Sequence, residues 1–193
     1  MKNRVKYLLF IFTLFVFFGC SPANVLVGTA GTGMVVSEGD RSIGTVVDDA
    51  TIKINIAAKF INSSDNLFVN INTSILEGRV LLTGLVDNQE IRIDAVRRVW
   101  EVDGVNEVIN EIQIGNRATL KEYAQDLWIT TQVKGLAAKT IGLRAISYNF
   151  ETIKGKVYVA GITSRPNQLE DLLSVIKTVK GVTEIVNYVI VKE

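Results

Sequence analysis

Histidine is absent from the 193-residue sequence, and cysteine occurs once, at position 20. The absence of histidine removes the commonest general base and the commonest zinc ligand, and one cysteine cannot form a disulfide within the chain. The adjacent acids Asp48 and Asp49 stand where a helix is expected to begin, so helix capping is favoured over a metal or acid–base site. A glycine-rich stretch, GTAGTG (28–33), lacks the Lys-Ser/Thr of a phosphate-binding loop. We therefore expect no enzymatic activity, cofactor or metal site.

The amino terminus has the composition of an export signal. Lys2, Arg4 and Lys6 precede an unbroken apolar run, LLFIFTLFVFFG (8–19), which ends just before Cys20. This run is too short to cross a bilayer as a helix, which takes about 20 apolar residues, and has the length of a signal-peptide core. We predict a signal peptide over 1–19.

The position of Cys20 resembles the lipobox of bacterial lipoproteins, in which a small residue precedes the modified cysteine. The resemblance implies cleavage before Cys20, acylation of that residue, and, with Ser21 next, transfer to the periplasmic face of the outer membrane. Several acyl chains anchor a protein durably where one does not. An ordinary signal peptide followed by an unmodified cysteine is the alternative.

The rest of the chain contains an internal repeat without gaps. EGRVLLTGLV (77–86) matches KGKVYVAGIT (154–163), and VDGVNEVINEI (102–112) matches VKGVTEIVNYV (179–189), both at an offset of 77 residues. We expect one small domain twice, over 48–115 and 125–193, with a tether over 20–47 and a linker over 116–124. Mutual packing is plausible, because each copy alone would be marginally stable.

Each copy predicts the order α-β-β-α-β. A first helix with Asp48, Asp49 or Asp126 near its positive end precedes two strands, 67–75 and 79–86 in the first copy, which meet at a Gly-containing turn. A second helix, beginning at Pro166 in the second copy, and a last strand close the unit. The expected fold class is α+β: each copy is a three-stranded mixed sheet with both helices on one face.

This order, the G-x-V-x-x-x-G hairpin and the V-x-G-V-x-x-V/I-x-N ending resemble the BON domain, a bacterial envelope module. Together with the lipobox, two such copies resemble the family of outer-membrane lipoproteins with two BON domains. The resemblance implies binding of anionic phospholipid through the opening helix of the second domain, and a role in envelope integrity and cell division.

Charge differs between the two copies. The first (48–115) has 6 basic and 11 acidic residues, a net charge of −5, whereas the second (125–193) has 9 basic and 6 acidic residues, a net charge of +3. An anionic membrane attracts each nearby basic residue by about 1 kcal/mol, so the second copy suits lipid better. Nucleic acid also attracts positive charge, but the expected compartment argues against it. Drift of surface charge between duplicates is the alternative.

The opening helix of the second copy places Trp128 away from its core stripe. At 100° per residue, Ile129, Val133 and Ala137 share one face, and Trp128 lies about 100° from Ile129. The residues around Trp128 have small side chains and are flanked by lysines. We predict that this surface binds lipid through Trp128, Thr131, Lys134, Gly135, Ala138 and Lys139. Packing of Trp128 between the copies is one alternative. A protein-interaction or chaperone-like role, acting on outer-membrane assembly proteins, is another.

The lipoprotein hypothesis predicts the behaviour of Cys20→Ser. Without the sulfur to acylate, the variant should lose incorporation of labelled palmitate and should leave the membrane fraction. Retention of both by the variant would contradict the prediction.

Overall fold

The computed structural model describes residues 43–63, 65–115 and 119–192, all of which belong to one compact unit, Gly33–Glu193. The predicted signal peptide, Cys20 and most of the predicted tether lie outside the described residues.

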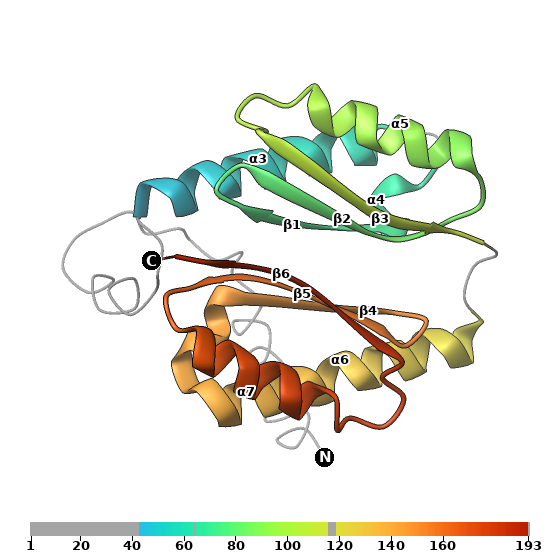
Figure 1. Cartoon of the computed structure of the whole chain (residues 1–193). Helices are drawn as coiled ribbons and strands as arrows, with labels where there is room; N and C mark the ends of the chain where they lie inside the picture. Colours follow the sequence, from blue (N-terminus) through green and yellow to red (C-terminus); the bar gives the residue numbers. More distant parts are fainter. Residues whose placement is uncertain (1–42, 64, 116–118, 193) are drawn as a thin grey trace, which may run out of the picture. The chain divides into compact units, whose positions relative to one another are not determined.

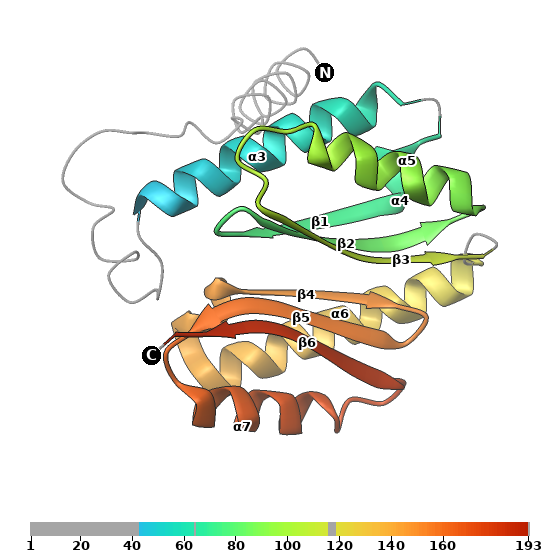
Figure 2. The same ribbon diagram turned by 45° about the horizontal axis from the view of Figure 1, so that its top comes forward.

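The two copies, hereafter repeat one and repeat two, have the same order of elements (Figures 1 and 2). Repeat one consists of α3 (Ile43–Ile61), α4 (Leu67–Asn70), β1 (Ile71–Leu76), β2 (Arg79–Val86), α5 (Gln89–Trp100) and β3 (Glu107–Ile114). Repeat two consists of α6 (Leu120–Ile141), the 3₁₀ helix η1 (Gly142–Ser147), β4 (Tyr148–Ile153), β5 (Lys156–Thr163), α7 (Pro166–Ile176) and β6 (Glu184–Val191). The second strand pairs antiparallel with the first and parallel with the third in each repeat. The predicted mixed sheets are confirmed.

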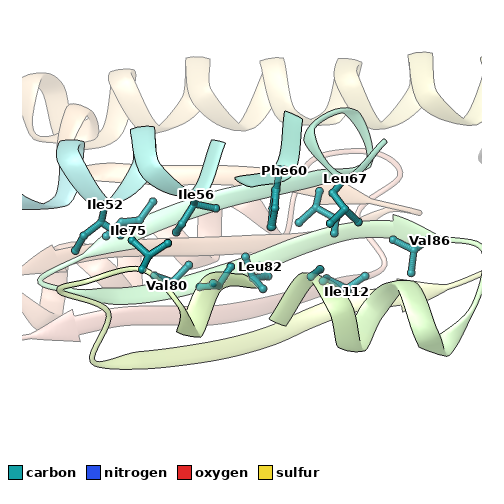
Figure 3. Close-up of a cluster of buried hydrophobic side chains, with 13 residues drawn as sticks. Ile52, Ile56, Phe60, Leu67, Ile75, Val80, Leu82, Val86 and Ile112 are labelled. Carbon is teal, nitrogen blue, oxygen red and sulfur yellow. The ribbon is translucent and has the colours of Figure 1, made fainter. Parts of the chain in front are cut away.

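The two long helices of each repeat cover one face of its sheet, as predicted (Figures 1 and 2). Figure 3 shows the resulting core of repeat one, in which Ile52, Ile56 and Phe60 of α3 contact side chains from the sheet. In repeat two, Ile129, Val133 and Ala137 of α6 are fully buried in the equivalent core. The shared stripe read from the sequence is therefore the core stripe.

Asp49 and Asp126 fix the hairpins and do not cap helices, which corrects the prediction. α3 begins at Ile43 and α6 at Leu120, so both aspartates lie inside a helix. The carboxylate of Asp49 accepts hydrogen bonds from the backbone N–H groups of Glu77 and Gly78, both at 2.9 Å. Asp126 accepts the same two bonds, at 2.7 and 2.8 Å, from the turn of repeat two. These turns have two successive residues with positive φ, which explains the glycine in each.

Two segments differ from the predicted elements. The strand expected over 67–75 begins only at Ile71, because residues 67–70 form α4, whose Leu67 is fully buried in the core of repeat one. The segment expected to link the repeats contributes its residues 120–124 to α6, which starts at a capping box between Thr119 and Glu122. Burial of Leu67 therefore outweighs the strand pattern at 67–70. The capping box at Thr119 outweighs the linker pattern at 120–124.

The two sheets pack against each other through the faces that carry no helices. Along β2, Val80 and Leu82 belong to the helix-covered core, whereas Leu81 lies in a separate cluster with Ala160 and Ile162 of repeat two. Such alternation is the normal consequence of a strand with two buried faces. The plausible packing of one copy on the other is confirmed.

Polar contacts cross the same interface. The Tyr188 hydroxyl donates to Glu111, the side-chain amide of Gln113 donates to Tyr158 Oη at 3.2 Å, and Lys192 pairs with Glu77. Burial, followed by the hydrogen bond to the Glu111 carboxylate, raises the pKa of Tyr188 above its usual value. The phenol therefore keeps its proton, and this hydrogen bond, to a higher pH than an exposed tyrosine would.

The hairpin contacts predict unequal effects of two neighbouring substitutions. Asp49→Ala removes a buried carboxylate and leaves two backbone donors without it, so the free energy of unfolding should fall by about 2–3 kcal/mol. Asp48→Ala is the matched control: Asp48 is exposed, and a surface substitution of this kind changes stability by about 0.5 kcal/mol or less. Chemical denaturation measures both, and equal stabilities of the two variants would refute the role of Asp49.

Candidate functional site

α6 packs against the rest of repeat two through contacts on its inner side. Ile129 and Val133 are fully buried, and the Thr130 hydroxyl donates to the Thr152 hydroxyl at 2.8 Å in a buried contact with β4. At the start of the helix, the Glu122 carboxylate accepts hydrogen bonds from the backbone N–H and the hydroxyl of Thr119. These bonds, the backbone one above all, hold the pKa of Glu122 below its usual value. These contacts use the inner side of α6 and leave its outer face to solvent.

All six predicted lipid-binding residues lie on the outward side of α6 and are exposed: Trp128, Thr131, Lys134, Gly135, Ala138 and Lys139. Trp128 is 49% exposed, and a methyl group added at Gly135 would meet no atom within 4 Å. The Thr131 hydroxyl donates to the Leu127 carbonyl of its own helix at 2.8 Å. Because that bond satisfies the hydroxyl, Thr131 can present its methyl group at little desolvation cost. We call this surface the α6 outer face.

Trp128 is displayed to solvent and does not fill the space between the repeats. Two grooves run between repeat one and repeat two, and their lining includes Leu127 and Lys134 but not Trp128. The side chains on α6 that meet the grooves are thus neighbours of the tryptophan. Trp128, which is 49% exposed, thus lies beside these two grooves and not in their lining.

Sequence reasoning missed two apolar members of the same surface. Tyr123 is 62% exposed and Leu127 is 56% exposed. Leu127 lies one turn before Thr131, and Tyr123 lies one turn before Leu127, so the i, i+4 spacing was available as a signal. Tyr123 falls within the predicted linker, 116–124, so the repeat pattern does not place it on the helix.

The lysines of the α6 outer face differ in pairing from the cations of repeat one. Within the described residues, neither Lys134 nor Lys139 has a carboxylate within ion-pair distance, whereas repeat one pairs four of its cations: Lys59, Arg79, Arg97 and Arg98. Near Lys134, burial raises the pKa of the Glu151 carboxyl, and the positive charge of Lys134 opposes that shift. The α6 outer face therefore offers ammonium groups that remain available to an external anion.

Other kinds of site are not visible in the described part of the chain. No three His, Cys, Asp or Glu side chains gather there in a way that could hold a metal ion. None of the helices between residues 43 and 192 combines the length and apolar character needed to cross a bilayer.

Comparison with known proteins identifies the repeats. The BON domain family matches residues 48–116 and 125–193. A protein of Anaplasma centrale named "Uncharacterized protein in gshII 5'region" is 37% identical over 147 residues, covering 76% of this chain and 96% of that protein. The outer membrane lipoprotein DolP of Haemophilus influenzae is 29% identical over 173 residues, covering 88% and 89%. The 21 kDa hemolysin of Actinobacillus pleuropneumoniae is 29% identical over 153 residues, covering 77% and 78%.

The exposure of Trp128 predicts the wavelength of its fluorescence emission and how readily that emission is quenched. With Trp100 replaced by Phe, Trp128 is the only tryptophan left, and its emission should be red-shifted and readily quenched by acrylamide because water reaches the ring. A blue-shifted, poorly quenched emission would show that Trp128 packs against protein.

Proposed function

The chain belongs to the BON domain family, and from this premise we propose that it is an outer-membrane lipoprotein whose second BON domain binds anionic phospholipid through the α6 outer face. In this proposal Cys20 carries the lipid anchor, the folded domains lie on the periplasmic side, and lipid binding supports envelope integrity. The name of the Haemophilus influenzae relative, an outer membrane lipoprotein, supports the compartment.

The observation that carries the proposal is an exposed tryptophan on a well-packed helix, beside lysines that form no ion pair with the described residues. Trp128 can bury its ring in the headgroup region while its indole N–H stays hydrated. Lys134 and Lys139 are exposed and can approach lipid phosphates without breaking an ion pair to any described residue. Small residues at Gly135 and Ala138 keep the surface shallow, which suits an interfacial contact without deep insertion.

The tryptophan contribution can be estimated from its exposed area. A buried tryptophan covers about 150–250 Å², so the 49% that is exposed corresponds to about 100 Å². At about 25 cal/mol per Å² its burial contributes about 2.5 kcal/mol. Binding should also weaken with ionic strength, because part of it is electrostatic.

Trp128→Gln should weaken partition of the unacylated protein into anionic vesicles at least tenfold, as measured by co-sedimentation. Trp100→Gln is the matched control, because Trp100 is 52% exposed, nearly as much as Trp128, but lies on α5 of repeat one. The control should bind as the wild type does. Equal binding by all three proteins, with unchanged thermal unfolding, would refute the assignment of the α6 outer face. Loss of binding in Trp100→Gln alone would favour a contact surface on repeat one.

A further inference from the structure

The larger of the two grooves between the repeats opens beside the α6 outer face. Its volume is about 520 Å³, and its lining brings Val69 of α4 together with Tyr123 and Leu127 of α6. Val69 is 80% exposed, more than Tyr123 or Leu127. Apolar side chains from both repeats thus border one opening.

α4 exposes Val69 to solvent. Leu67 is fully buried and anchors the short helix in the core of repeat one, while the next two residues, Phe68 and Val69, remain exposed. Phe68 lines the second groove, which also contacts Lys134. Both side chains are therefore accessible to a partner outside the fold.

The groove also carries cations near its apolar rim. Lys134 and Lys154 both line it, and among the described residues neither has a carboxylate within ion-pair distance. Of the two acids in the lining, Asp126 already accepts two backbone hydrogen bonds from the hairpin turn. An apolar rim beside available ammonium groups is the arrangement that an anionic amphiphile requires.

We propose that α4 and the groove form the second half of the lipid-contact surface: Val69 and Phe68 enter the membrane interface beside Leu127, and Lys134 and Lys154 meet lipid phosphates. This inference rests on the proposed function and extends it from repeat two to repeat one. The contact surface then spans both repeats, and its geometry depends on their packing.

Membrane lipid fits this opening better than a second copy of the chain does. The rim adjoins the α6 outer face, because Lys134 belongs to both and Leu127 lies one turn before Thr131. The rim consists of a few apolar side chains, whereas a specific protein interface involves roughly 20–30 residues on each side. A lipid surface needs no such complementary area, because it moulds to the side chains that enter it.

Val69→Gln tests the inference with the full mature chain and with vesicles of phosphatidylglycerol mixed into phosphatidylcholine. We expect about tenfold weaker partition, from the loss of an aliphatic side chain at the interface. The same factor should appear at low and high salt, because Val69 is uncharged. Lys154→Gln should instead lower binding only at low salt. Ile93→Gln is the matched control: it lies on α5 of the same repeat and is 57% exposed, and its binding should not change.

The outcomes separate the two proposals. If Trp128→Gln weakens binding and Val69→Gln does not, the extension to α4 is overturned and the α6 assignment stands. If neither variant changes binding, both are overturned. Concentration-dependent dimerisation that Val69→Gln abolishes, with vesicle binding unchanged, would assign the rim to a second copy and overturn the lipid inference. Thermal unfolding of each variant confirms that the fold is retained.

Discussion

The burial of two bare sheet faces against each other is the constraint on which the rest of the structure depends. A three-stranded sheet with helices on one face still exposes an apolar second face, and a domain of this size has little other area to bury. Leu81 of one sheet packs in the same cluster as Ile162 of the other, so each repeat buries the second face of the other. This arrangement turns every long helix outward, so that α6 needs only one of its sides for packing.

Much of the fold could be predicted because the sequence contains two copies of the same pattern. The constant offset of 77 residues set the domain pattern, and the comparison of Ile52 with Ile129 separated the core stripe from the position of Trp128. The contribution of Leu67 could not be predicted in this way. Its burial converts the start of an apparent strand into α4, and only the three-dimensional core provides that contact.

The roles of Asp49 and Asp126 were missed for a related reason. An aspartate followed by a helical pattern suggests a cap, and the sequence does not show that a hairpin turn 28 residues later will lie beside it. The exposed neighbours of Trp128 were partly missed because the capping box at Thr119 starts the helix earlier than the repeat pattern suggests. In both cases the missing information was a contact or a helix start that the residue pattern alone does not reveal.

One contact shows how duplication shaped this molecule. Glu111 and Tyr188 occupy the same position in their repeats, 77 residues apart, and they hydrogen-bond to each other. Such a self-equivalent contact lies at the approximate twofold axis between the repeats. Two copies of repeat one facing each other would place two carboxylates there, in a partly buried site where like charges repel. The tyrosine of repeat two replaces that repulsion with a hydrogen bond, so this position favours the contact between unlike repeats over a contact between two copies of repeat one.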